Sequence, residues 1–244
     1  FIIIGASSGL GRELSYKFAK NKNDLVLISR DERDLTPLKS DLEEKYKISV
    51  KIFCIDFSEA DQIIEKLIPE IKKLNNIKGI LFPVGLMHEK DEVNLSKESV
   101  KDIFYANFLS ITLTIIELRK IINKKDILIV GFGSVSGLLG RNLNSNYAAS
   151  KRALESYFES LAFNKEEKNF KVHFYTLGYL DTNLAFGKKL VLPKGRTSTL
   201  ANIVYKNKDK KIVKRYFPYF WGPIALIIKL IPLKILIKIK KILK

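Results

Sequence analysis

The chain has 244 residues, 46% of them hydrophobic, and a formal net charge of +17 at pH 7. A chain of this length and apolar content can bury one sizeable core, so we expect one main domain. Its single cysteine, Cys54, excludes an internal disulfide, and with only His88 and His173 as histidines the sequence predicts no metal site. Cys54 lies in an apolar run, and we interpret it as a small core residue.

Apolar runs of strand length alternate with segments of helical length along the chain. The predicted strands are residues 1–4, 25–29, 50–55, 80–83, 127–130 and 172–176. This alternation is typical of an α/β fold of the Rossmann type, a doubly wound parallel sheet with helices on both faces. We assign residues 1–205 to this domain and residues 206–244 to a C-terminal tail. Because the first strand begins at residue 1 without a methionine, we expect the natural chain to start a few residues earlier.

A glycine-rich turn, GASSGLG at residues 5–11, separates the first predicted strand from a helical pattern of apolar residues. Glycines let the backbone approach a pyrophosphate, whose charge is favoured by the N–H groups and dipole of a helix N-terminus. The spacing differs from the GxGxxG dinucleotide fingerprint, and such a turn alone could be an ordinary loop. The flanking strand and helix favour a phosphate site made by Gly5, Ser7, Ser8, Gly9, Leu10 and Gly11.

Tyr147 and Lys151 are four residues apart in a predicted helix, which places a phenol and an ammonium on one face. A lysine cation beside a tyrosine favours the phenolate and lowers the tyrosine pKa from its usual ~10 towards the range useful for proton transfer. On its own such a pair could be a chance feature of a surface helix. We predict that it transfers a proton.

The glycine-rich turn and four later residues give the chain its resemblance to the short-chain dehydrogenase/reductase superfamily over residues 1 to about 205: Asn107, Ser134, Tyr147 and Lys151. The resemblance implies that the Ser134 and Tyr147 hydroxyls hold and protonate a substrate carbonyl. It also implies that Lys151 lowers the Tyr147 pKa and binds the nicotinamide ribose, while Asn107 supports a water that relays protons. Ser136 is an alternative to Ser134, and Asn107 could be an ordinary polar helix residue.

Three segments differ from the family pattern. Ile4 stands where a threonine is usual, residues 82–85 read FPVG in place of NNAG, and residues 177–178 read LG in place of PG. The differences put the fine positioning of the cofactor in question, and they leave the catalytic residues in place.

Cofactor choice depends on Arg30, at the end of the second predicted strand, where the adenosine ribose lies in doubly wound folds. An arginine there can bind the 2′-phosphate of NADP(H), which we favour, whereas the neighbouring Asp31 leaves NAD(H) open. The resemblance further implies that Asp56 contacts the adenine, although Asp56 could instead cap a helix. It implies contacts near the nicotinamide from Gly85, Gly178 and Thr182.

Positive charge is concentrated in the tail, where residues 206–244 hold twelve lysines or arginines and one acid, Asp209. On a helical wheel the lysines fall on one side and the isoleucines on the other. With aromatic residues from Tyr216 to Trp221 ahead of it, the segment predicts an amphipathic helix in the interface of an anionic membrane, over residues 216–244. Lys229, Pro232 and Lys234 interrupt it too early for a span.

The composition of the tail would also fit packing on the core, a subunit contact, or a genome biased towards Lys, Ile and Asn. Nucleic-acid binding ranks below these, because no recognition fold accompanies the charge. We expect the protein to lie at the cytoplasmic face of a membrane. The resemblance implies a homo-oligomer formed by the helices of residues 97–122 and 147–164.

The tail, together with Asn146 and with Asp91 downstream of the Gly85-Leu86 loop, is similar to a subgroup that includes the decaprenylphosphoryl 2-keto-arabinose reductase. This implies NAD(P)H-dependent reduction of a ketone on a lipid-linked or activated sugar. Charges at Lys188, Lys189, Lys194 and Arg196 favour an anionic substrate. A ketoreductase of fatty-acyl, sphingoid or sterol-like lipids is the alternative, and an apolar pocket would favour it. A non-catalytic nucleotide-binding scaffold or sensor is the alternative of another class.

Overall fold

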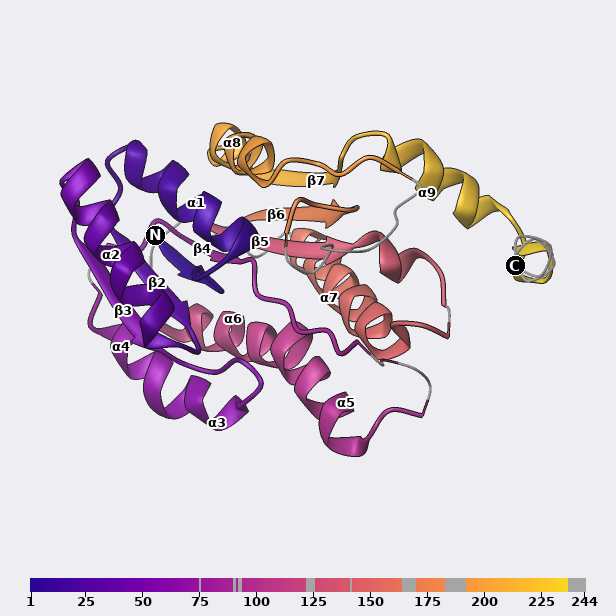
Figure 1. Ribbon diagram of the computed structural model, residues 1–244, viewed down its shortest axis with the longest axis horizontal. Coiled ribbons are helices and arrows are strands. Elements are labelled where there is room, and N and C mark those ends of the chain that lie inside the picture. Colours follow the sequence, from indigo (N-terminus) through magenta and orange to yellow (C-terminus); the bar gives the residue numbers. More distant parts are fainter. Residues whose placement is uncertain are drawn as a thin grey trace.

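The computed structural model describes the chain except for residues 75, 90, 92–93, 122–125, 141, 164–169, 183–191 and 237–244. It contains a sheet of seven parallel strands in the order β3-β2-β1-β4-β5-β6-β7 (Figure 1). The strands are β1 Ile2–Ile4, β2 Leu25–Ser29, β3 Val50–Cys54, β4 Gly79–Phe82, β5 Ile127–Ser134, β6 Phe170–Leu177 and β7 Ile212–Phe217. The predicted fold class is confirmed.

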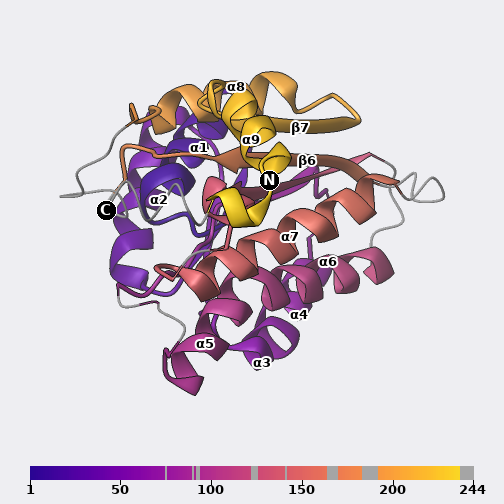
Figure 2. The same cartoon turned by 90° about the vertical axis from the view of Figure 1, so that its right-hand side faces the viewer.

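Helices cover both faces of the sheet, and Figure 2 shows the two layers on either side of it. One layer contains α1 Gly9–Lys20, α2 Glu32–Tyr46 and α8 Thr197–Asn207. The other contains α4 Ile68–Lys72, α6 Ser110–Ile121 and α7 Ser145–Phe163. Because the central strands are buried on both faces, their sequences are continuous apolar runs rather than alternating ones.

Shorter helical segments complete the fold: α3 Ala60–Gln62, α5 Lys97–Phe104, α9 Trp221–Leu230, a 3-10 turn at Val135–Leu138, and π-helical turns at Ile63–Leu67 and Tyr105–Leu109. α5, the second π-helical turn and α6 form a continuous helix, Lys97–Ile121, which is long and apolar enough to cross a membrane. About 39% of its apolar window is buried in the protein, and its Ile111, Ile115 and Leu118 pack in one of the two helical layers on the sheet. A single helix of this kind is weak evidence for a membrane span.

The strand order reverses direction between β1 and β4, because the chain moves outwards from β1 to β3 and then returns to continue with β4. At such a point the helices that follow the two strands pack on opposite faces, which leaves a crevice at the carboxyl ends of the strands. The glycine-rich turn follows β1, and the loop containing Gly85 follows β4. The fold therefore brings these two segments to one crevice.

The core extends further along the chain than the sequence analysis placed it. Residue 205 lies inside α8, and β7 pairs with β6 from Val172↔Ile212 to Leu177↔Phe217. Residues 206–217, assigned above to the tail, thus complete α8 and add the edge strand. Charged residues within β7, Lys214 and Arg215, obscured the strand in the sequence, although charge is a common feature of sheet edges.

Two side chains are placed differently from expectation. Cys54 is exposed at the end of β3 rather than in the core. Trp221, assigned above to a membrane-facing aromatic belt, is only 8% exposed and packs edge-on against Tyr179, with ring centroids 5.9 Å apart. Trp221 therefore belongs to the folded body of the protein.

Candidate active site

The glycine-rich turn has the geometry of a phosphate cradle. Gly5 and Gly9 have φ angles of 89° and 47°, in the region that favours glycine. A Cβ on Gly11 would lie 1.9 Å from the Gly5 carbonyl oxygen, so glycine is needed there for close packing of the turn on α1. Ser8 precedes α1 without making a side-chain cap, which leaves the first N–H groups of the helix available to an anion.

Asn107 lies in the π-helical turn Tyr105–Leu109 and is fully buried. Its side-chain oxygen accepts from the Leu86 N–H at 2.8 Å, and its amide nitrogen donates to the Leu86 carbonyl at 2.8 Å and to Ser150 Oγ at 3.1 Å. Asn107 thereby holds the loop after β4 against α7. These bonds give Asn107 a structural role here, and its part in a proton relay stays a prediction.

Lys151 lies beneath Tyr147, with its Nζ 5.9 Å from the centroid of the tyrosine ring. The side chain is 4% exposed, and Nζ donates to the carbonyl oxygens of Val84 and Phe132, each at 3.2 Å. Burial in this low-dielectric position lowers the pKa of Lys151 to about 8. The ammonium is thus held in place by the backbone of the loop after β4 and of β5.

Ser134 is the last residue of β5, which is longer than predicted. Its Oγ accepts from the Ser136 N–H at 3.1 Å and begins the 3-10 turn. Both serines line the same cavity as Tyr147, so the structure keeps either hydroxyl within the site.

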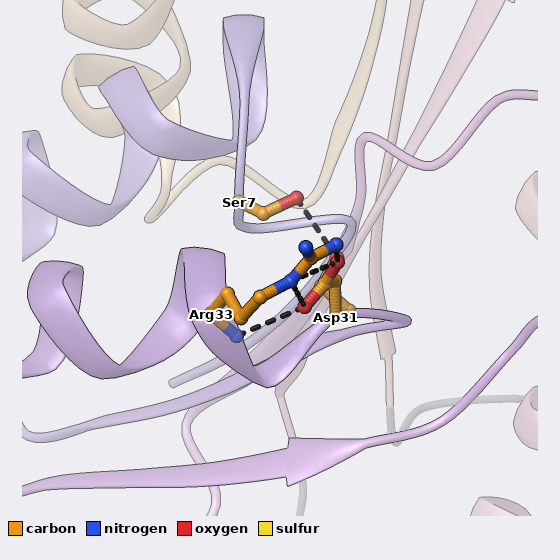
Figure 3. Close-up of polar contacts among 4 residues, drawn as sticks. Ser7, Asp31 and Arg33 are labelled. Atoms are coloured by element: carbon orange, nitrogen blue, oxygen red, sulfur yellow. Dashed lines mark hydrogen bonds and ion pairs between the residues drawn. The ribbon is translucent and has the colours of Figure 1, made fainter.

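At the other end of the crevice, Asp31 caps α2 and is bound by Arg33 (Figure 3). Asp31 Oδ1 accepts from the Arg33 N–H at 2.9 Å and from Arg33 Nε at 3.0 Å, and the same pair forms an ion pair. Hydrogen bonds from Arg33 lower the pKa of Asp31 to about 2. Nearby, Ser29 Oγ donates to Ser7 Oγ at 2.8 Å. Arg33 was not among the predicted site residues, although its position two residues after a helix-capping Asp was visible in the sequence.

Asp56 Oδ1 accepts from the Ser58 N–H at 2.9 Å and from Ser58 Oγ at 2.7 Å. This local bonding belongs to a turn ahead of α3, which begins at Ala60, so Asp56 is not the helix cap considered above. The residue also lines the cavity, so an adenine contact stays a prediction.

One cavity of about 870 Å³ joins these segments. Of the predicted site residues, Asn107 and Gly11 lie behind its wall and the others line it: Gly5, Ser7, Ser8, Gly9, Leu10, Arg30, Asp56, Gly85, Ser134, Tyr147, Lys151, Gly178 and Thr182. The cavity therefore connects a phosphate cradle to a tyrosine–lysine pair.

The cavity lining also includes a set of large, mainly apolar side chains: Leu86, Met87, Leu138, Leu139, Tyr179, Trp221 and Ile228. Trp221 and Ile228 come from α9 and were missed by sequence reasoning, which placed them in a membrane. A Cβ on Gly178 would lie 1.9 Å from Trp221 Nε1, so a glycine is required where the indole packs. Lys188 and Lys189 lie outside the described residues, and Lys194 and Arg196 are not among the lining residues.

The fold and the cavity define a nucleotide-binding protein of the Rossmann type with a tyrosine–lysine pair in the lining of its cavity. Residues 1–189 match the family model for short chain dehydrogenase. The chain belongs to the short-chain dehydrogenase family.

Curated relatives include the very-long-chain 3-oxoacyl-CoA reductases of Vanderwaltozyma polyspora and Kluyveromyces lactis. The first is 29% identical over 83% of this chain and 62% of the relative, and the second is 33% identical over 75% and 55%. The 3-oxoacyl-acyl-carrier-protein reductase FabG of Buchnera aphidicola is 26% identical over 75% of this chain and 74% of the relative. The chain thus spans less than two thirds of the length of the two very-long-chain reductases.

Solved structures share the fold. A short-chain dehydrogenase from Sphingobium yanoikuyae in complex with NADPH has a TM-score of 0.77 at 20% identity and covers 86% of both chains. An alcohol dehydrogenase from Thermococcus sibiricus complexed with 5-hydroxy-NADP has a TM-score of 0.77 at 19% identity, over 88% of this chain and 94% of that one.

Proposed function

We propose that this protein is an NADP(H)-dependent ketoreductase that acts on a lipid-type ketone. The observation that supports this most strongly is the position of the Tyr147 and Lys151 pair in the same cavity as the glycine-rich turn. When bound, the nicotinamide would supply a hydride to the carbonyl carbon. A non-catalytic scaffold would have no need of a lysine buried beneath a tyrosine, because burial of an ammonium is costly.

Tyr147 is the proton donor in this proposal, and its phenol protonates the carbonyl oxygen as the hydride arrives. The positive charge of Lys151 stabilises the phenolate that results. Two carbonyl hydrogen bonds hold the Lys151 ammonium, so this charge is fixed before substrate binds. Ser134 supplies a second hydroxyl at the same end of the cavity and orients the carbonyl oxygen.

The apolar walls favour a lipid over the lipid-linked or activated sugar expected above. The sugar interpretation relied on basic residues that are either outside the described residues or away from the cavity lining. The named relatives reduce 3-oxoacyl thioesters, according to their names. We therefore propose a 3-oxoacyl thioester, with its acyl chain between Leu138 and Trp221.

NADP(H) is the proposed cofactor because of the charges at the adenosine end. Arg30 lines the cavity and is exposed, which leaves its guanidinium accessible to a 2′-phosphate. Asp31 would repel that phosphate, but Arg33 compensates its charge. Two structures of the same fold were solved with NADPH or 5-hydroxy-NADP.

We also propose that α9 binds an anionic membrane surface. Figure 1 shows α9 projecting from the sheet beyond the carboxyl end of β7. Its Leu226, Ile227 and Leu230 are 61%, 58% and 73% exposed, while Ile228 on the same helix lines the cavity. Lysines at 229 and 234, and those of residues 238–244, match an anionic surface. We propose in addition that the protein lies at the cytoplasmic face of this membrane, and that the helices of residues 97–122 and 147–164 form a homo-oligomer.

A substrate panel tests the assignment. Purified protein is mixed with NADPH and one of three ketones: a long-chain 3-oxoacyl thioester, a short water-soluble ketone, or a phosphorylated keto-sugar. We expect the highest kcat/KM for the long-chain thioester, since each buried CH₂ contributes about 0.8 kcal/mol. A higher kcat/KM for the keto-sugar would overturn the lipid assignment, and no oxidation of NADPH with any ketone would overturn the enzymatic one.

A further inference from the structure

The N-terminus of α7, the helix that contains Tyr147 and Lys151, is bonded to a buried carboxylate from another part of the chain. Asp91 lies in the segment after β4 and is 1% exposed. Its Oδ2 accepts from the Tyr147 N–H at 2.7 Å, and its Oδ1 accepts from the Asn146 N–H at 3.0 Å. Asn146 Nδ2 donates to the same Oδ1 at 2.8 Å.

These contacts involve the backbone of Tyr147 itself. The first N–H groups of a helix have no partner within the helix, so an outside acceptor determines how firmly the first turn is held. The Asp91 carbonyl oxygen also accepts from the Asn144 N–H at 2.5 Å, which ties down the residue just before α7. Asp91 thus holds the start of the helix from both its side chain and its backbone.

The segment that contains Asp91 is fixed at a second point within the site. Leu86, five residues earlier, exchanges two hydrogen bonds with Asn107. A Cβ on Gly85 would lie 3.5 Å from Lys151 Nζ, so the same segment also borders the buried lysine. The loop after β4 therefore links three parts of the site: Lys151, Asn107 and the first turn of α7.

We propose that Asp91 is a positioning residue for Tyr147. Asp91 sets the position of the phenol through the backbone of α7 and does not contact the substrate. The inference rests on the proposed function, because it assumes that Tyr147 donates the proton. Both carboxylate oxygens are needed, since each accepts from a different backbone N–H. An asparagine would keep the size of the side chain but would turn an NH₂ towards one of these donors.

The test compares Asp91→Asn with Leu118→Ala, which truncates a fully buried residue of α6 and lowers stability in general. Hydrogen exchange is measured on the peptide that contains residues 144–148, and steady-state kinetics are measured with NADPH and ketone. We expect Asp91→Asn to speed exchange at Asn146 and Tyr147 and to lower kcat about 10- to 100-fold. The KM for NADPH should change less than threefold, because the glycine-rich turn is untouched. A threefold change corresponds to a free energy of about RT.

Leu118→Ala should leave the exchange of this peptide and kcat near their wild-type values at a temperature where both variants are folded. If Asp91→Asn leaves kcat unchanged, or if Leu118→Ala lowers it equally, Asp91 has only a general structural role and the proposal is overturned. Hydrogen exchange is independent of turnover. If the wild-type protein reduces no ketone but Asp91→Asn still speeds exchange at Asn146 and Tyr147, the proposed function is wrong. The conclusion that Asp91 holds the first turn of α7 would then still stand.

Discussion

Lys151 combines two properties that conflict energetically, burial and the ability to carry charge. Its ammonium is bonded to two carbonyl oxygens, yet burial lowers its pKa to about 8. The sequence predicted the proximity of Tyr147 and Lys151 from their spacing. It could not predict that Val84 and Phe132 would supply the carbonyl groups, because those contacts join residues far apart in the chain.

The lowered pKa of Lys151 makes the free energy of unfolding depend on pH. Between about 8 and 10.5 the unfolded state binds more protons at this residue, so the stability of wild type should rise with pH relative to Lys151→Met. Below about pH 8 both states are protonated and the difference should be constant. Urea unfolding of both proteins from pH 7 to 10.5 measures the difference between their free energies of unfolding. A difference that falls across this interval would contradict a lysine pKa lowered by burial.

Two arginines at the proposed adenosine site, Arg30 and Arg33, have separate expected effects. Arg30→Ala should weaken NADPH binding by about 1.5 to 3 kcal/mol and leave NADH binding nearly unchanged, because only NADPH has the 2′-phosphate. Arg33→Ala should weaken NADPH and strengthen NADH, since it removes the partner of the Asp31 carboxylate. Fluorescence titration gives the Kd values of each variant for NADPH and NADH.

Arg12→Ala, on α1 and outside the cavity lining, is the control for the change in net charge. Equal losses for both cofactors in Arg30→Ala would show that Arg30 has a structural role.

At the scale of elements, β7 and α9 belong to the folded body. Most of the other strands were predictable because they are largely apolar and buried on both faces. β3, at the opposite edge, is partly exposed, and it was predictable because Val50, Ile52 and Phe53 keep it mainly apolar. β7 was not, because its edge position lets Lys214 and Arg215 interrupt the apolar pattern. The contact between Gly178 and Trp221 joins the end of β6 to the start of α9, and only the fold reveals it.

Gly178→Ala tests that contact. The new methyl group would lie 1.9 Å from Trp221 Nε1, and a rigid indole cannot yield without moving α9. We expect a loss of about 1 to 3 kcal/mol in the free energy of unfolding and a shifted fluorescence spectrum, since Trp221 is the single tryptophan. Gly140→Ala, where a Cβ would meet nothing within 4 Å, is the control. In a Trp221→Ala background the cost of Gly178→Ala should fall to near zero. An unchanged cost there would place the strain elsewhere.

At the scale of the whole molecule, the net charge of +17 and the exposed face of α9 give a specific expectation for membrane binding. Intact protein should co-sediment with anionic vesicles and dissociate as salt rises, because each lysine near the surface contributes about 1 kcal/mol that salt screens. Replacement of Leu226, Ile227 and Leu230 by serine should reduce the binding that remains at high salt. Phe163→Ser, which removes an 82% exposed residue of α7, is the control. Equal sedimentation of the triple variant and wild type would exclude α9 as the docking surface.

The central claim is that Tyr147 protonates a ketone as hydride leaves a nicotinamide held by the glycine-rich turn. The most direct measurement is single-turnover reduction of a long-chain 3-oxoacyl thioester with deuterated NADPH, followed by mass spectrometry of the product. Wild type should place one deuterium on the carbonyl carbon. Tyr147→Phe, which lacks only the acidic O–H, should bind NADPH with a similar Kd and react about 10² to 10⁴ times more slowly. A folded Tyr147→Phe protein that forms the deuterated alcohol at the wild-type rate would contradict the account.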